Sequence, residues 1–227
     1  MIFGINITTF NRYEYVKTFF DSLKNTFILD NTIINITDDA STDNRVIDLI
    51  KNFINKNEND KVNFFQNETN IGSKINYEKS LCTFINEKVD FIINLDSDCI
   101  FHKNWMLEIK KIIDLFGENV LCSSFFCENH LGNPNNKLHF IKNEIDNQTY
   151  VERDTLNGLG ICFPKKILNE FLNNNITKHF DNYLNDDLKK KYNLRCICTS
   201  VSYIQHIGEH GVNSRPNFYD KSNNFMG

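Results

Sequence analysis

The chain has 227 residues and a mass of 26.7 kDa, a length for which one large domain is the expected organisation. Hydrophobic residues make up 41% of the sequence and aromatic residues 13%, which excludes a disordered chain. The net charge of −4 excludes a general basic surface, so we expect no nucleic-acid partner.

The N-terminal segment, Met1–Thr8, is apolar but only about as long as a strand. It lacks the basic region and the cleavage site of a signal peptide. No run approaches the roughly 20 apolar residues that span a bilayer. The seven cysteines are scattered without a CxxC pair, which fits free thiols better than a disulfide framework. We therefore expect a cytoplasmic protein without a transmembrane segment.

The first half alternates apolar strand patterns with amphipathic helix patterns. Strands are predicted over Ile2–Thr8, Thr32–Thr37, Val62–Phe65 and Phe91–Leu95. Helices are predicted over Tyr13–Asn25, Asp43–Ile54, Lys74–Ile85 and Lys103–Phe116. This alternation predicts a parallel sheet with helices on both faces.

The pattern changes after a further apolar run, Val120–Phe126, which a polar loop, Glu128–Asn136, follows. Helices are then predicted over Lys165–Asn173 and Asp181–Tyr192, paired or continuous strand over Arg195–Ile204, and an irregular tail over Gly208–Gly227. No linker or second core is visible. We expect one domain over residues 1–227, with a parallel half at 1–126 and a more antiparallel half at 127–227.

Four predicted strands each end in a polar cluster, at Thr8–Arg12, Asp38–Asp43, Asn67–Gly72 and Asp96–Asp98. In open α/β sheets, ligands bind at the carboxyl ends of the strands. Capping of the following helices explains any one cluster equally well. Capping alone does not require two acidic pairs, so we interpret the four clusters together as a binding site.

Asp96 and Asp98 would point to the same side if the strand stays extended beyond Leu95. Two carboxylates so close repel unless a cation lies between them or one is protonated. Hard oxygen ligands suit Mg²⁺ or Mn²⁺. The sequence has neither GxGxxG nor GxxxxGK[ST], so a bound nucleotide would need the metal to neutralise its diphosphate. The imidazole of His206 suits Mn²⁺, although a lone histidine at a strand end is more often structural.

In this order and at these spacings, the clusters resemble the family 2-like inverting glycosyltransferases of the GT-A fold. The similarity covers the Thr-Phe-Asn-Arg opening (Thr9–Arg12), the Asp-Asp-x-Ser-x-Asp signature (Asp38–Asp43), the Asn-x-Gly turn (Asn70–Gly72) and the Asp-x-Asp at Asp96–Asp98. The resemblance implies an α/β fold with a mostly parallel central sheet flanked by helices, plus a small antiparallel acceptor-side part. Residues 1–126 would bind the nucleotide sugar, and residues 127–227 would bind the acceptor and carry the catalytic group.

The resemblance also implies roles for single residues. Asp39 would accept a hydrogen bond from the base, typically uracil, and Asp96 would approach the ribose. Asp98 would hold a Mn²⁺ or Mg²⁺ ion that bridges the diphosphate, with His206 as a further ligand. The other residues implied in nucleotide-sugar binding are Thr8, Arg12, Asn70, Gly72 and Arg215.

Asp181 resembles the family's catalytic base. The usual Glu-Asp pair is replaced here by Phe180-Asp181, so a single acid remains. Capping of the helix that starts at Asp181 is the alternative interpretation.

These implications predict a metal-dependent, inverting hexosyl- or N-acetylhexosaminyltransferase that uses a UDP-sugar. Its acceptor hydroxyl would belong to a saccharide, a protein or a lipid-linked molecule. One alternative is a sugar-phosphate nucleotidyltransferase, although Thr8–Arg12 is neither Gly-rich nor strongly basic. Another is a catalytically silent nucleotide-sugar or glycan-binding domain, which the single acid at Asp181 favours.

Overall fold

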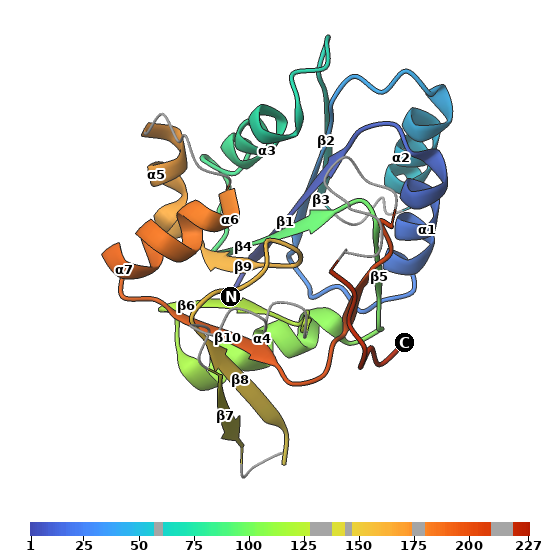
Figure 1. The fold of residues 1–227 in the computed structure, drawn as a ribbon. Coiled ribbons are helices and arrows are strands. Elements are labelled where there is room, and N and C mark those ends of the chain that lie inside the picture. Colours follow the sequence, from blue (N-terminus) through green and yellow to red (C-terminus); the bar gives the residue numbers. More distant parts are fainter. Residues whose placement is uncertain (57–60, 128–137, 144–146, 174–179, 210–219) are drawn as a thin grey trace.

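A computed structural model describes the chain except for residues 57–60, 128–137, 144–146, 174–179 and 210–219 (Figure 1). The first four strands of the main sheet are β1 (Phe3–Thr9), β2 (Ile33–Asp38), β3 (Lys61–Gln66) and β4 (Phe91–Asp96). They lie in the order β3-β2-β1-β4, and every neighbouring pair is parallel. The parallel sheet predicted from these four strand patterns is therefore confirmed.

The sheet continues beyond β4 with mixed strand directions. The next strands are β9 (Cys162–Pro164), β6 (Val120–Ser123), β10 (Arg195–Thr199), β8 (Thr149–Arg153) and β7 (His139–Lys142), in that order across the sheet. β9 is antiparallel to both β4 and β6, and β8 is antiparallel to both β10 and β7, whereas β10 is parallel to β6. The fold is thus mixed α/β with a large, mostly parallel central sheet.

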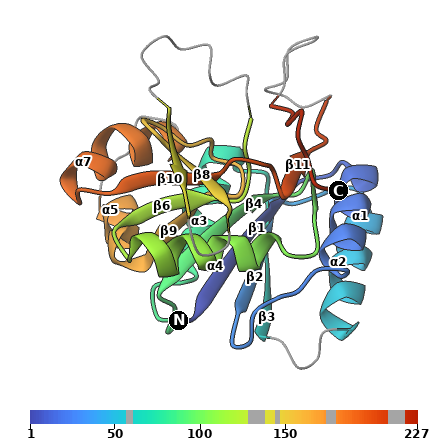
Figure 2. The same cartoon turned by 90° about the horizontal axis from the view of Figure 1, so that it is seen from below.

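Helices cover both faces of the sheet and form two hydrophobic cores. On one face lie α1 (Tyr13–Leu23), α2 (Asn44–Lys56) and α4 (Trp105–Phe116), and Figures 1 and 2 show α1 and α2 side by side. The other core contains α3 (Ser73–Cys82), α5 (Leu168–Asn173) and a π-helical turn at Leu184–Leu188. α6 (Phe180–Tyr183) and α7 (Lys189–Lys191) flank this π turn.

A row of asparagines runs across the parallel strands at one level. Asn6 in β1 is level with Asn35 in β2 and with Asn94 in β4, and Asn35 is level with Asn63 in β3. Asn6 Nδ2 donates to Asn94 Oδ1 at 3.0 Å, and Asn63 Nδ2 donates to Asn35 Oδ1 at 2.8 Å. Buried amides need hydrogen-bond partners, so the asparagine row favours this strand register over registers shifted by one residue.

The segment predicted as paired or continuous strand over Arg195–Ile204 contains two strands, which pair with other strands and not with each other. β10 ends at Thr199, and β11 (Ile204–His206) pairs antiparallel with β5 (Cys99–Phe101) in a separate two-stranded sheet. His206 is level with Cys99 in this pair. The short pairing therefore brings His206 beside the turn that holds Asp98.

Other boundaries also differ from the prediction. The apolar run Val120–Phe126 forms strand only as far as Ser123, and the helix predicted over Asp181–Tyr192 contains the π turn. The predicted loop Glu128–Asn136 lies outside the described residues. Within the described ranges, no helix is both long and apolar enough to cross a bilayer. All seven cysteines are free thiols, and only Cys82 is exposed.

Gly4 faces a ring that leaves no room for a side chain. A Cβ added there would lie 2.5 Å from Cε1 of Phe84, and Phe84 is fully buried. We expect Gly4→Ala to lower the free energy of unfolding by about 1–3 kcal/mol, because the clash forces the packing apart. Urea denaturation measures this change. The cost of Gly4→Ala should fall in a Phe84→Leu background, and an equal cost in both backgrounds would contradict the clash.

Candidate functional site

Asp98 is the centre of a charged cluster at the carboxyl edge of the sheet. β4 ends at Asp96 and the chain turns at Ser97 and Asp98, so the extended geometry assumed from the sequence does not persist. Asp98 is 8% exposed. Arg12 Nη1 donates to Asp98 Oδ2 at 2.8 Å, and His206 Nε2 lies 3.4 Å from Asp98 Oδ1. The structure thus brings together three of the residues singled out from the sequence.

The pKa values of the two acids in the Asp-x-Asp motif are shifted in opposite directions. Burial acts to raise the pKa of Asp98, but His206 and Arg12 outweigh it, so this pKa lies below its ordinary value. Burial, reinforced by the charge of Asp98, raises the pKa of Asp96 to about 6. Burial acts to lower the pKa of His206, yet the Asp98 carboxylate outweighs burial and the pKa is raised. Asp98 therefore stays ionised to a lower pH than Asp96 does.

The backbone at Gly208 packs directly against the side chains of Asp98 and His206. Ile207 N donates to the Asp98 carbonyl oxygen at 2.8 Å. A Cβ at position 208 would lie 2.1 Å from Asp98 Oδ2 and 2.6 Å from His206 Nε2. The glycine of the His-Ile-Gly segment is therefore required by close packing against the two site residues.

Arg12 is held in place by a strained turn. Asn11 and Arg12 have φ of 48° and 56°, a left-handed conformation that costs free energy for residues other than glycine. Asn11 Oδ1 accepts hydrogen bonds from the backbone of Thr42 and Asp43, at 2.9 and 3.2 Å. The Arg12 guanidinium stacks 4.2 Å from the centre of the Tyr15 ring.

Two nitrogens of Arg12 are not used by any residue that the structure describes. Its buried Nε and Nη2 have no hydrogen-bond partner among the described residues. A planar guanidinium with spare donors suits a phosphate oxygen.

Asp39 organises the Asn-x-Gly turn. Its buried carboxylate accepts the backbone N–H of Ile71 at 2.9 Å and that of Gly72 at 3.0 Å, and Asn67 Nδ2 at 3.0 Å. Asn70 Oδ1 also accepts from Gly72 N, at 3.1 Å, and Gly72 has a φ of 86° that favours glycine. Asp39, Asn70 and Gly72 therefore form one structural unit.

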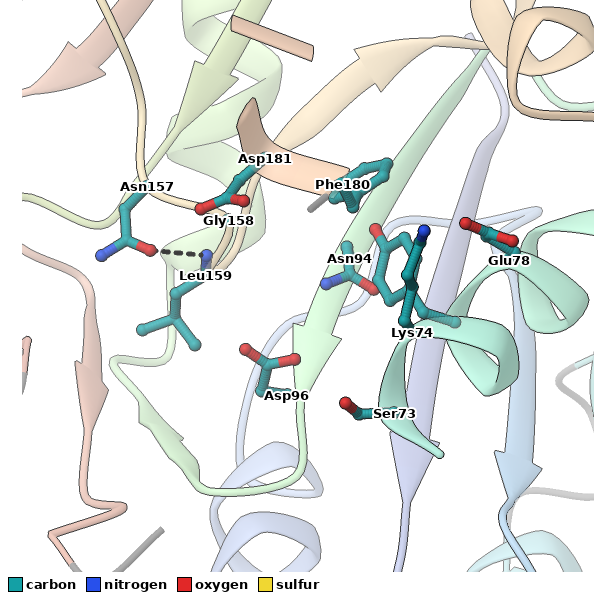
Figure 3. A pocket seen from close by; sticks show the side chains of 11 residues that line it. Ser73, Lys74, Glu78, Asn94, Asp96, Asn157, Gly158, Leu159, Phe180 and Asp181 are labelled. Atoms are coloured by element: carbon teal, nitrogen blue, oxygen red, sulfur yellow. Dashed lines mark hydrogen bonds between the residues drawn. The ribbon is translucent and has the colours of Figure 1, made fainter. Parts of the chain in front are cut away.

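A cavity of about 240 Å³ lies beside this unit (Figure 3). It is lined by one face of α3, by the end of β4, by residues 157–159 and by the start of α6. Figure 3 shows the carboxylates of Asp96 and Asp181, which reach the cavity from β4 and α6. Thr8, half-buried, is level with Asp96 on the neighbouring strand.

Asp181 lies within α6, so it is not the residue that precedes the helix, as the capping alternative requires. A buried amide fixes this segment: Asn185 Nδ2 donates to the carbonyl oxygens of Asp181 and Leu156, at 2.7 and 2.8 Å. Asn185 Oδ1 in turn accepts from Leu156 N at 2.8 Å. The α6 segment and the loop before β9 are thus held together.

Some candidate residues were missed and others cannot be placed. Tyr77 and Lys74 line the cavity, but they resemble ordinary residues of an amphipathic helix in the sequence. Their signal is the spacing of Ser73, Lys74, Tyr77 and Glu78 directly after the Gly72 turn, which puts them on one helix face. Arg215 lies outside the described residues. Within the described ranges, no group of three His, Cys, Asp or Glu side chains is arranged to hold a metal ion.

The mostly parallel sheet with an acidic site at its strand ends is of the GT-A type, as comparison with known proteins shows. The family model for glycosyl transferase family 2 matches residues 5–177, well over half of the chain. The chain therefore belongs to glycosyl transferase family 2. A search of curated protein sequences finds no significant match.

Solved structures support the same fold. S. aureus TarS 1-349 is 18% identical over 92% of this chain and 61% of that chain, with a TM-score of 0.63. The same protein in complex with UDP-GlcNAc gives 17% identity, 93% and 62% coverage, and a TM-score of 0.62. The mannosyltransferase PcManGT from Pyrobaculum calidifontis, in complex with GDP-Man and Mn²⁺, is 12% identical. The match covers 74% of this chain and 46% of that chain, with a TM-score of 0.55. The chain spans less than two thirds of each neighbour, and at these identities the likeness shows the fold alone.

The contacts of Asp39 generate a stability prediction. In Asp39→Asn an NH₂ group replaces one carboxylate oxygen and then faces N–H donors that it cannot accept from. We therefore expect the free energy of unfolding to fall by about 1–3 kcal/mol. Urea denaturation measures it. Asp43→Asn is the matched control: Asp43 pairs locally with the exposed Arg45, so this variant should lower the free energy of unfolding clearly less than Asp39→Asn does. Equal costs for the two variants would contradict the role of Asp39 in the turn.

Proposed function

We propose that this chain transfers a hexosyl or N-acetylhexosaminyl group from a UDP-sugar to an acceptor hydroxyl, with inversion at the anomeric carbon. The observation that carries the proposal is one cavity lined by both Asp96 and Asp181, beside the Asp98 cluster. Membership of family 2 supports sugar transfer, and the TarS complex with UDP-GlcNAc supports the choice of UDP. The acceptor would be a saccharide, a protein or a lipid-linked molecule.

The residues around Asp98 fit a divalent cation. Asp98 Oδ1 is buried without a hydrogen-bond partner among the described residues, and an imidazole nitrogen of His206 lies 3.4 Å away. A hard carboxylate oxygen with an imidazole suits Mn²⁺, and to a lesser degree Mg²⁺. Asp98 and His206 would hold the ion, which would stabilise negative charge on the leaving nucleoside diphosphate. The PcManGT complex, which contains Mn²⁺, supports this assignment.

The remaining steps belong to side chains of the chain itself. Asp181 would take the proton of the acceptor hydroxyl as that oxygen attacks the anomeric carbon. The unpaired Nε and Nη2 of Arg12 would contact a phosphate oxygen of the donor. Asp39 would hold the turn that borders the base, and Thr8 would line the nucleotide pocket. A single displacement without a covalent intermediate inverts the configuration of the sugar.

The two halves of the chain would divide these tasks. Residues 1–126 supply Asp96 and the α3 side of the cavity, and residues 127–227 supply Asp181 and the 157–159 side. We propose that they act as one domain, with the donor bound mainly by the first half and the acceptor by the second. A cytoplasmic location stays a prediction from the sequence.

Donor binding is tested by calorimetric titration of UDP with and without Mn²⁺. We expect Mn²⁺ to strengthen binding to the wild-type chain, and Asp98→Ala to weaken the Mn²⁺-dependent binding at least about 10-fold. The matched control is Asp114→Ala, a partly exposed carboxylate on α4 that pairs with Lys110. UDP binding that ignores both Mn²⁺ and Asp98 would contradict the metal assignment. Pyrophosphate release from a nucleoside triphosphate and a sugar phosphate would favour the nucleotidyltransferase alternative.

The base is tested by Asp181→Asn. We expect kcat to fall by about 10²–10⁴-fold, because the amide cannot accept the acceptor's proton, while the Kd for UDP stays unchanged. Steady-state kinetics and calorimetry give the two values. Asp187→Asn, on the exposed side of the same helical segment, is the control. Wild-type kcat in Asp181→Asn would assign the base to another group, and a wild-type chain that binds UDP-sugars without ever turning them over would favour the silent binding domain.

A further inference from the structure

Tyr77 has a buried hydroxyl that forms no hydrogen bond to any residue the structure describes. Its side chain is part of α3, lines the cavity and is 9% exposed. The Oη atom has no hydrogen-bond partner among the described residues. The ring packs against Phe180, with centroids 4.2 Å apart, and belongs to the same core as Leu81. The Tyr77 side chain is therefore packed between the cavity and the core.

An unpaired buried hydroxyl lowers stability, and most buried polar groups in folded proteins have partners. Burial, together with the charges of Asp96 and Asp181, raises the pKa of Tyr77 well above its ordinary value. The phenol is thus neutral, with one proton to donate and lone pairs to accept. A ligand hydroxyl, which also donates and accepts, satisfies both capacities.

The charges around the cavity restrict what that ligand can be. Asp96, Asp181 and Glu78 line it, against a single described cation, Lys74. This excess of carboxylates repels a phosphate or a carboxylate, whereas a neutral polyhydroxyl ring carries no such penalty. The volume of about 240 Å³ is also below the roughly 300–1,000 Å³ of pockets for drug-sized ligands. A monosaccharide fits this cavity better than a whole nucleotide does.

We propose that Tyr77 is a specificity-determining residue whose hydroxyl binds a hydroxyl of an uncharged donor sugar in this cavity. The inference rests on the proposed function and narrows it, because a uronic acid or another acidic sugar is disfavoured. The alternative is that Tyr77 only fills space in the core. In that case loss of the hydroxyl would leave ligand selectivity unchanged.

The test compares wild type with Tyr77→Phe by calorimetry in the presence of Mn²⁺. The probes are UDP alone, UDP-glucose, UDP-galactose, UDP-N-acetylglucosamine and UDP-glucuronate, followed by monodeoxy analogues of the donor that binds tightest. We expect Tyr77→Phe to weaken the binding of that donor by about 5- to 10-fold and to leave the Kd for UDP within about 2-fold of the wild-type value. One deoxy analogue, which lacks the partner hydroxyl, should bind both proteins equally. The wild type should bind UDP-glucuronate at least about 10-fold more weakly than the tightest neutral donor.

Tyr150→Phe is the matched control, because Tyr150 is fully buried and its hydroxyl bonds to Gln148 instead of lining the cavity. It should change no ligand affinity. Thermal unfolding separates a folding defect from a binding defect: Tyr77→Phe removes an unpaired buried hydroxyl, so its midpoint should not fall below that of the wild type.

A wild-type chain that binds no nucleoside diphosphate overturns the proposed function, and this inference with it. Three results overturn the Tyr77 inference alone in a chain that binds UDP. They are equal donor affinities for wild type and Tyr77→Phe, equal weakening of every deoxy analogue, or UDP-glucuronate bound as tightly as the neutral donors.

Discussion

The register of the four parallel strands is the constraint on which the site depends. Asparagines of β1, β2, β3 and β4 lie at one level and pair side by side in the sheet interior. A slip by one residue would turn these amides toward the opposite core and leave them unpaired. Because the register is fixed, the strand ends are fixed as well: Thr8 meets Asp96, and Thr9 meets Asp38. The polar edge of the sheet therefore follows from amides two and three residues further inside.

The acidic residues at that edge serve two different purposes. The carboxylate oxygens of Asp38 and Asp39 accept hydrogen bonds that stabilise local structure. Asp38 accepts hydrogen bonds from Thr9 and Ser41, and Asp39 accepts those that hold the turn before α3. Asp96 and Asp98 instead face a cavity and a cationic cluster, and their pKa values move apart. Adjacent carboxylates with separated pKa values are common at catalytic sites. The strained turn at Asn11 and Arg12 serves the same site as Asp96 and Asp98, because it places the Arg12 guanidinium against the Asp98 carboxylate.

The sequence was sufficient for elements whose pattern is local. β1, β2 and β4 are short isoleucine-rich runs with one asparagine each, and α2 repeats its buried residues at helical spacing, so these elements were predicted within a few residues. β5 and β11 have three residues each, too few for a periodic pattern, and they are stabilised by pairing across about a hundred residues of chain. The proximity of His206 and Asp98 depends on that pairing, so the resemblance to a family could suggest it and local pattern could not. Tyr77 and Asn185 were missed because a tyrosine or an asparagine on the inner side of a helix looks like core until its partners, or their absence, are known.

The distribution of thiols has a practical consequence. Six of the seven cysteines are buried, and Cys82, the last residue of α3, is the exposed one. Burial raises the pKa of the Cys82 thiol, and its Sγ donates to the carbonyl oxygen of Glu78, one helical turn back, so alkylation calls for mildly alkaline buffer. A maleimide dye would therefore attach at one position without any engineered cysteine. That position lies on the helix that carries Ser73, Lys74, Tyr77 and Glu78, so the native chain already contains an attachment point for a fluorescent reporter of events in the cavity.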